Sequence, residues 1–227
     1  METKTKPGLI KSVEKDERFM AEQLRKPNGS FAEIVGNQMN NFNEVLYEFV
    51  IDLMQLKDHE NILEIGFGNG KFFNKLFNKN GSLKIKGIDF SKEMVHSAEL
   101  YNQQAISNGK LKLYLGNSEK LPFPDNSFDE VFCNMVIYFW EEPEKHLKEI
   151  RRVLKSNGKF FAGLRTKEST LRFPFAKYGF IFYEPNEWKI ILEKCGFLLS
   201  GINKKLERPI NFKGQNLRLE SICYVAE

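Results

Sequence analysis

Cysteine, long apolar runs and excess charge of either sign are all scarce in this sequence. The three cysteines, Cys133, Cys195 and Cys223, lie far apart, which excludes a disulfide framework and the usual spacing of a zinc site. So few cysteines suit a reducing compartment. No apolar run is long enough to span a membrane, and the N-terminus has no apolar signal core. We therefore expect a cytoplasmic protein with no membrane span and no bound metal.

The balance of charge is close to even, with 34 Lys and Arg residues against 30 Asp and Glu residues. The sequence has no basic stripe interleaved with aromatic residues, so we expect no nucleic-acid partner. Its 227 residues suit a single α/β domain with a sizeable core. A monomer or a homodimer is expected.

The most informative segment begins at a short apolar run, Ile62–Ile65, which reads as a buried strand. Glycines follow at alternate positions, Gly66, Gly68 and Gly70, and a helical pattern comes next. Glycine allows a backbone bend at positive φ and lets a ligand approach without meeting a Cβ atom. A strand that leads through such a turn into a helix is typical of a nucleotide-binding site.

The spacing of these glycines indicates which kind of nucleotide. A dinucleotide-binding turn reads G-x-G-x-x-G and holds a pyrophosphate, whereas this one reads G-x-G-x-G. Glu64 lies at the edge of the turn and would repel a pyrophosphate. A cofactor that has no phosphate and carries positive charge fits better, and S-adenosylmethionine is such a molecule.

A second strand–helix unit supports this interpretation. The strand Leu83–Ile88 ends at Asp89, whose carboxylate can accept hydrogen bonds from both ribose hydroxyls. Ser91 is the expected N-cap of the helix that follows. A third strand is predicted at Leu111–Leu115 and a fourth at Glu130–Val136.

Four stretches between about Asn61 and Leu164 read, in order, ILEIGFGNGKF, IKGIDFSKEMV, GNSEKLPFPDNSFDEVFCNMVIYFW and LKEIRRVLKSNGKFFAGL. Together they resemble the class I S-adenosylmethionine-dependent methyltransferases (methyltransferase type 11), in the group that includes the ubiquinone and menaquinone C-methyltransferases. The resemblance implies a Rossmann-like, doubly wound α/β fold. Its seven-stranded sheet is mostly parallel with the last strand antiparallel, and helices at the N-terminus cover it.

The resemblance also implies roles for individual residues. Four of them would surround the methionine part of the cofactor: Glu64, Gly66, Gly68 and Gly70. Asp89 would hold the ribose, and Phe90 would lie beside the adenine. Catalysis would then be an in-line displacement that depends mainly on positioning the acceptor.

Three further residues would complete the cofactor site. The family usually has Asp where this chain has Asn117, so its contact with the adenine amino group lacks a charge and should be weaker. Ser118 would add a backbone donor to the adenine ring. Asn134 would bind the amino-acid end of the cofactor and face the acceptor, although Asn is also common in plain turns.

The resemblance divides the single domain into three parts: an N-terminal cap over 1–45, a cofactor-binding core over 46–165, and a substrate-side part over 166–227. In the cap, we expect a loop and short helix over Phe31–Asn43, then an amphipathic helix over Glu44–Met54. The amide-rich stretch 36–42 is either a lid or a solvated turn.

After the fourth strand, Pro143 begins a helix that runs to about Leu154, and Gly158 is expected to end it in the left-handed conformation. A fifth strand follows at Lys159–Leu164. The segment Thr166–Tyr183 is rich in aromatic residues, which either line a pocket for an apolar or ring-containing acceptor or simply cover the end of the sheet.

The last predicted elements are a helix from Glu184 to Gly196 and an antiparallel strand pair, Phe197–Asn203 with Leu217–Val225.

The sequence does not identify a general base. Tyr138, Tyr183 and His146 are candidates, although a capping or surface role is the simpler expectation for His146.

The alternative functions are a protein or RNA methyltransferase and a regulatory protein that binds S-adenosylmethionine without catalysis. The Asn-Pro-Pro-Tyr motif of many amino-group methyltransferases does not occur, since the corresponding residues are Asn134–Ile137.

Overall fold

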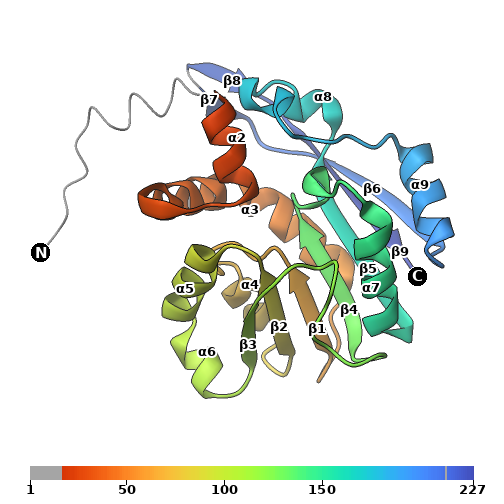
Figure 1. Ribbon diagram of the computed structural model, residues 1–227. Coiled ribbons are helices and arrows are strands. Elements are labelled where there is room, and N and C mark those ends of the chain that lie inside the picture. Colours follow the sequence, from red (N-terminus) through yellow and green to blue (C-terminus); the bar gives the residue numbers. More distant parts are fainter. Residues whose placement is uncertain (1–16, 213) are drawn as a thin grey trace, which may run out of the picture.

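The computed structural model describes residues 17–212 and 214–227 (Figure 1). Its centre is a seven-stranded sheet in the order β3-β2-β1-β4-β5-β9-β6. The strands of this sheet are β1 (Asn61–Ile65), β2 (Lys84–Asp89), β3 (Leu111–Leu115), β4 (Phe128–Asn134), β5 (Leu154–Arg165), β6 (Leu199–Leu206) and β9 (Glu220–Ala226).

The first five strands pair in parallel, whereas β9 pairs antiparallel with both β5 and β6. The chain enters the sheet near its middle at β1, builds outward to β3, and then crosses to the other side through β4. This arrangement confirms the predicted doubly wound, mostly parallel sheet with an antiparallel last strand. The predicted ranges of the first three strands are correct to within one residue at each end.

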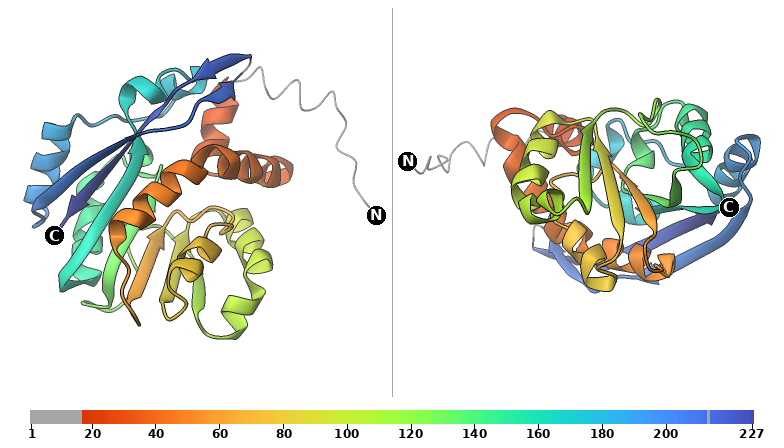
Figure 2. Two further views of the ribbon diagram at one scale, coloured as in Figure 1. Left: turned by 180° about the vertical axis from the view of Figure 1, so that it is seen from behind. Right: turned by 90° about the horizontal axis from the view of Figure 1, so that it is seen from below.

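Helices cover both faces of the sheet (Figures 1 and 2). They are α2 (Glu17–Arg25), α3 (Ala32–Met54), α4 (Phe73–Lys79), α5 (Lys92–Tyr101), α6 (Gln103–Ser107), α7 (Pro143–Val153), α8 (Lys167–Thr170) and α9 (Pro185–Lys194), with single turns η1 (Gly29–Phe31), η2 (Ile137–Phe139) and η3 (Pro174–Lys177). None of the helices in the described part of the chain has the length and apolar character needed to cross a bilayer.

Strand residues alternate between two hydrophobic layers, as expected for a sheet buried on both faces. Ile62 and Phe132 face the layer built with α3, α4 and α5, while Leu63 and Val131 face the layer built with α7 and α9. Trp188 of α9 is fully buried in the second layer. Most of the 21 phenylalanines lie in or against these two layers.

The N-terminal region differs from the prediction. The expected loop and short helix over Phe31–Asn43 and the helix over Glu44–Met54 form one continuous helix, α3, of 23 residues. The amide-rich stretch 36–42 is therefore helical rather than a turn. Packing explains the difference, because Gly36 and Asn40 within this stretch, and Val35 just before it, are buried.

Gly158 was also predicted incorrectly. Its φ lies outside the left-handed range, and β5 already begins at Leu154, so no glycine cap ends α7. The reason for glycine here is space, since an added Cβ would lie 2.8 Å from Leu154 Cδ2 and 3.0 Å from the carbonyl oxygen of Asp129.

A two-stranded hairpin between β6 and β9 was not foreseen. Its strands are β7 (Ile210–Phe212) and β8 (Gln215–Leu217), and they lie outside the main sheet. The hairpin packs on a small hydrophobic cluster that includes Phe173, Leu217 and Leu219. It stands beside α2 and α8 at the top of the molecule in Figure 1.

Candidate functional site

Register in the sheet brings three predicted residues together. Ile65 is paired with Ile88 of β2 on one side and with Cys133 of β4 on the other. The residues that come next, Gly66, Asp89 and Asn134, therefore leave the carboxyl edge of the sheet side by side. In open α/β sheets, ligands bind in the crevice at this edge.

The glycine turn has the backbone that its sequence predicts. Gly66, Gly68 and Gly70 have φ values of 71°, 59° and 67°. A Cβ atom on Gly66 would lie 2.5 Å from Val136 Cγ2, and one on Gly70 would lie 2.6 Å from Ala98 Cβ. At Gly68, by contrast, no atom lies within 4 Å of the Cβ position. The turn is thus closely packed at its two ends and open in the middle.

Asp89 is buried at the end of β2 and is held by the turn. Its Oδ2 accepts a hydrogen bond from the backbone N–H of Gly68 at 2.9 Å, and its Oδ1 accepts one from Ser91 at 2.9 Å. Burial raises the pKa of Asp89 to about 6, although these backbone donors act in the opposite direction. Ser91 also caps α5 as predicted, since its hydroxyl accepts from the backbone N–H of Met94.

Glu64 is buried beneath the turn and is paired with a residue that sequence reasoning missed. Tyr47 of α3 donates its hydroxyl to Glu64 Oε2 at 2.8 Å, and both side chains are almost fully buried. Burial raises the pKa of Glu64 to about 8, and the nearby Asp89 carboxylate contributes in the same direction.

A cavity of about 180 Å³ opens above the turn. It is lined by most of the predicted cofactor residues: Gly66, Gly68, Asp89, Phe90, Asn117, Ser118 and Asn134. His146 also lines it. Glu64 and Gly70 do not, because Glu64 lies below the turn and Gly70 packs against Ala98 of α5.

Asn134 supplies the clearest sign of a ligand. Both polar atoms of its side chain, Oδ1 and Nδ2, are buried and have no hydrogen-bond partner among the described residues. Unpaired buried polar groups are uncommon in folded proteins and are costly. Because Asn134 lines the cavity, a bound molecule with a donor and an acceptor would satisfy it.

His146 is buried, not at the surface as expected. Its Nδ1 lies 2.8 Å from Ser118 Oγ, its Nε2 lies 3.4 Å from Glu119 Oε1, and its ring stacks on Trp140 at 4.5 Å. Burial lowers the pKa of His146 to about 4, so the ring is neutral near pH 7. It holds the loop that contains Asn117, whose Oδ1 accepts from the backbone N–H of Glu119.

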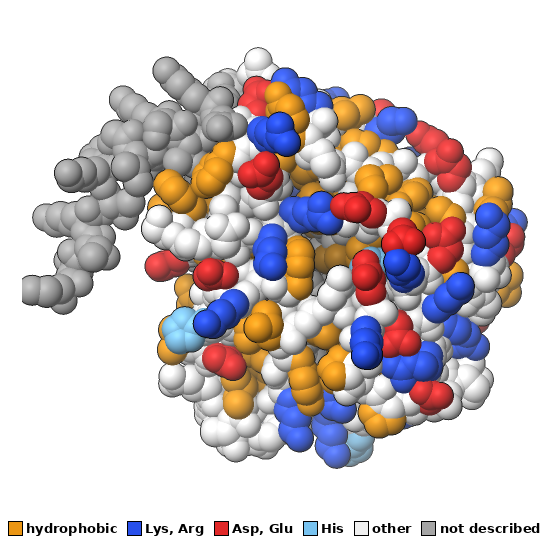
Figure 3. All heavy atoms as spheres, in the orientation of Figure 1, with side chains coloured by type: hydrophobic (Ala, Val, Ile, Leu, Met, Phe, Trp, Pro, Cys, Tyr) orange, Lys and Arg blue, Asp and Glu red, His pale blue; other side chains and the backbone are white. Residues whose placement is uncertain are grey.

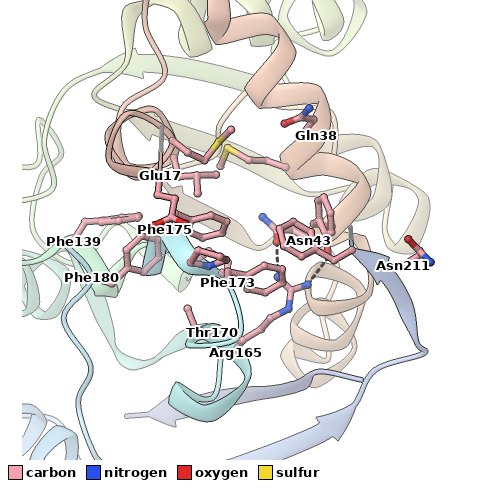
Figure 4. A pocket seen from close by; sticks show the side chains of 17 residues that line it. Glu17, Gln38, Asn43, Phe139, Arg165, Thr170, Phe173, Phe175, Phe180 and Asn211 are labelled. Carbon is pink, nitrogen blue, oxygen red and sulfur yellow. Dashed lines mark hydrogen bonds between the residues drawn. The ribbon is translucent and has the colours of Figure 1, made fainter. Parts of the chain in front are cut away.

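A second, larger cavity of about 350 Å³ adjoins the first (Figure 4). Four residues line both cavities: Leu24, Met39, Met135 and Phe139. Met135 has a left-handed backbone with φ of 60°, which is unusual for a residue other than glycine. Five more phenylalanines line it: Phe42, Phe173, Phe175, Phe180 and Phe212.

Arg165 forms the base of the larger cavity. Its guanidinium binds Glu207 through two hydrogen bonds, of 2.9 and 3.1 Å. It also donates to Asn43 Oδ1 at 3.0 Å and to the carbonyl oxygen of Phe42 (Figure 4). Arg165 and Glu207 are both almost fully buried. Pairs this far apart in sequence leave no local pattern, so the sequence did not reveal them.

The two tyrosine candidates line neither of these cavities. The Tyr138 hydroxyl donates to the carbonyl oxygen of Arg165 and lies 3.1 Å from Thr170 Oγ1, and burial raises its pKa well above the usual range. Tyr183 donates to the carbonyl oxygen of Trp140 at 2.9 Å. Both hydroxyls connect the turn after β4 to the end of β5 or to the segment that follows it.

Residues 63–162 match the family model of a methyltransferase domain. YrhH of Bacillus subtilis, provisionally named a methyltransferase, is 31% identical to the chain over 123 residues, which make up 54% of this chain and 67% of YrhH. The chain belongs to this family, the S-adenosylmethionine-dependent methyltransferases.

Two other relatives extend the comparison. An uncharacterized protein of Methanocaldococcus jannaschii is 39% identical over 132 residues, 57% of each chain. The demethylmenaquinone methyltransferase of Bacillus licheniformis is 32% identical over 134 residues, 59% of this chain and 56% of that protein. The alignment with each of these two relatives thus covers little more than half of the relative's length.

Solved structures agree on the fold. A chain of the Haloferax volcanii complex between the activator Trm112 and its provisionally assigned methyltransferase has a TM-score of 0.73 at 18% identity, covering 91% of this chain and 96% of that chain. An S-adenosylmethionine-dependent methyltransferase from Aquifex aeolicus has a TM-score of 0.60 at 21% identity, covering 98% of each chain.

Proposed function

We propose that this chain transfers the methyl group of S-adenosylmethionine to a small acceptor with an apolar or aromatic body. The observation that carries the proposal is the pair of adjoining cavities. One is lined by the glycine turn, Asp89 and Asn134, and the other is mainly apolar and includes six phenylalanines. They meet at Met135 and Phe139, where a methyl donor and its acceptor would come together.

The residues of the smaller cavity fit the cofactor chemically. Asp89 would accept from the ribose hydroxyls with the lone pairs that the two backbone donors leave free. Asn134, with both polar atoms unpaired, would bind the amino-acid end. The open space at Gly68 would let the methionine part approach the backbone. Bound there, the cofactor supplies a sulfonium-activated methyl group.

At the adenine end we assign Phe90, Asn117 and Ser118. Lys26 Nζ lies 5.2 Å from the centre of the Phe90 ring, which helps to hold that ring at the edge of the cavity. The contact between His146 and Ser118 fixes the loop from the other side. The role of His146 is thus to position this loop, because its Nδ1 is engaged by Ser118 and its ring is stacked on Trp140.

Catalysis would depend on positioning. Holding the acceptor atom in line with the methyl group of the sulfonium supplies much of the rate enhancement by alignment alone. The ionisable side chains in the described lining of the larger cavity are Glu17 and Arg165, and both are engaged in ion pairs. The acceptor atom would therefore be nucleophilic without a nearby protein base.

Calorimetry with S-adenosylmethionine tests the cofactor assignment. Asp89→Ala should weaken binding by about 1.5–3 kcal/mol, the scale of a lost hydrogen bond to a charged group. Asp52→Ala is the matched control, because Asp52 pairs with Lys79 at the surface. Equal affinity of wild type and Asp89→Ala would refute the ribose role, and tighter binding of NAD would refute the cofactor.

Turnover distinguishes the alternatives. We expect release of S-adenosylhomocysteine with at least one acceptor in a panel of small phenols, quinols, thiols and amines. Tight cofactor binding without transfer to any of them would favour a regulatory role. Transfer to protein or RNA in place of small acceptors would show a macromolecular substrate.

A further inference from the structure

The walls of the larger cavity form a connected row of aromatic rings. Phe139 lies 4.9 Å from Phe180 between ring centres, Phe180 lies 5.9 Å from Phe175, and Phe175 lies 5.3 Å from Phe173. Phe212 then contacts Phe173 edge to face at 4.9 Å. The row therefore runs from the boundary with the cofactor cavity to the β7–β8 hairpin.

The two ends of this cavity are built by different elements of the fold. Phe139, from the turn after β4, lines both cavities, whereas Asn211 and Phe212 come from β7. In Figure 4, Phe139 and Phe180 lie on one side of the cavity and Asn43 and Asn211 on the other. Phe42 of α3 meets Phe212 edge to face at 6.3 Å, so α3 and the hairpin close the far end together.

Charges in the described lining are compensated within the protein. Glu207 neutralises Arg165 at the base, and Lys177 pairs with Glu17 at 2.8 Å near α2. The remaining polar groups are neutral, such as the amide of Asn43. A charged ligand would lose hydration here without gaining an unpaired partner, so the cavity favours an uncharged one.

Nearly all of this lining lies outside the residues matched by the family model. Only Met135 and Phe139 fall within 63–162, while the other lining residues come from α2, α3, the last residue of β5, the segment after β5, and the hairpin. The features that select an acceptor are thus particular to the parts of this chain that the family model does not describe.

We propose that Phe212 closes the far end of the acceptor cavity, so that the chain selects uncharged acceptors by the length of their apolar body. This inference rests on the proposed function, which makes the larger cavity the acceptor site. The reacting atom would lie at the Phe139 end, and the opposite end of the molecule would stop at Phe212.

A series of 4-n-alkylphenols, from ethyl to octyl, tests the proposal by calorimetry with the cofactor product S-adenosylhomocysteine present. In the wild type, affinity should rise about fourfold for each added methylene until the chain reaches Phe212, and then stop rising. Phe212→Ala should move this limit to longer chains. Ile210→Ala is the control, because Ile210 packs on the hairpin cluster but does not line the cavity.

Phe212→Leu provides a milder change if the alanine variant is unstable, and it should move the limit in the same direction. An unchanged limit in the Phe212 variants, or an equal shift in Ile210→Ala, would overturn the proposal. So would equal binding of 4-n-butylbenzoate, which carries a charge, and 4-n-butylphenol. If the cofactor product binds normally but every alkylphenol fails, this inference fails while the cofactor assignment stands.

Discussion

Two buried carboxylates, Glu64 and Asp89, stand at the ends of neighbouring strands. Burial raises the pKa of Glu64 to about 8 and that of Asp89 to about 6. Glu130, buried near the opposite end of β4, has a pKa raised to about 8 for the same reason. The ligand-free protein therefore holds protons on acidic groups that would be ionised in the unfolded chain.

The sign of the pH dependence follows from these shifts. Glu64 and Glu130 bind their protons more tightly in the folded protein, so the contribution of each to stability is present below the unfolded pKa of about 4.5 and is lost as pH rises to about 8. We expect the free energy of unfolding to fall between these limits, by up to about 1.4 kcal/mol per pH unit for each group. Urea unfolding near pH 5 and pH 8 measures it. Glu64→Gln should reduce the slope, and an unchanged slope would exclude Glu64 as a contributor.

Asn117 stands where the resemblance to the methyltransferase family implies an Asp near the adenine. Asn117→Asp should add a charged acceptor near the adenine amino group and tighten cofactor binding about fivefold, or ~1 kcal/mol. Calorimetry with S-adenosylmethionine measures the change. Asn157→Asp adds the same charge at an exposed position of β5 and should leave affinity unchanged. Equal affinities for both variants would argue against the adenine contact.

At the scale of elements, α2 covers both cavities. Leu24 lines the two of them, Glu17 and Met20 line the larger, and Arg25 lines the smaller. Two ion pairs hold the ends of the helix, Glu17 with Lys177 and Arg25 with Glu141 at 3.0 Å. Exposed pairs of this kind are worth about 0–1 kcal/mol, so they can open readily.

Reversing one of these charges should loosen the cover. In Glu141→Lys, repulsion from Arg25 should raise the cofactor dissociation rate about fivefold, measured by stopped-flow fluorescence. Adding Arg25→Glu restores an attractive pair and should return the rate toward the wild-type value. The effect should shrink at high salt, because exposed charges are screened. A rate that does not respond to either variant would show that this pair does not hold the helix.

The sequence predicts the elements with strong local signals. The strand at Ile62, the glycine turn, Asp89 and the Ser91 cap all depend on neighbouring residues, and each forms as expected. These signals place the smaller cavity, because parallel register alone aligns the strand ends.

The aromatic segment Thr166–Tyr183 supplies part of the lining of the larger cavity, but the contacts that close this cavity leave no local signal. α3 is continuous because residues such as Asn40 pack inward, although the amide-rich stretch alone favours a turn. The pairing of Arg165 with Glu207 and the meeting of Phe42 with Phe212 join distant segments. These contacts become visible only when the chain is folded.

At the scale of the whole molecule, Arg165 connects the N-terminal and C-terminal parts of the chain. Its guanidinium joins α3, through Asn43, to Glu207 in the segment after β6, and Ser221 of β9 donates to the same Glu207 carboxylate at 2.6 Å. Positive and negative side chains elsewhere are interspersed over the face in Figure 3. The Arg165–Glu207 ion pair is thus buried, unlike the many ion pairs at the surface of this protein.

Removing one partner of this pair should be costly. Glu207→Ala leaves the Arg165 charge buried without its partner, so we expect a loss of about 3–5 kcal/mol in the free energy of unfolding. The double variant Arg165→Met with Glu207→Leu removes both charges and should recover most of that loss. Urea unfolding of the three proteins measures it. A loss below about 1 kcal/mol in Glu207→Ala would mean that water reaches the pair.

The cover formed by α2 also has a kinetic consequence. Since one helix lies over both cavities, a single movement of α2 would expose both, and under the proposed function the two products would leave during the same opening. Every turnover then contains one opening and one closing, whatever acceptor is used. Where that movement is slower than the chemistry, it sets kcat. Acceptors of very different reactivity would then share one kcat and differ only in KM.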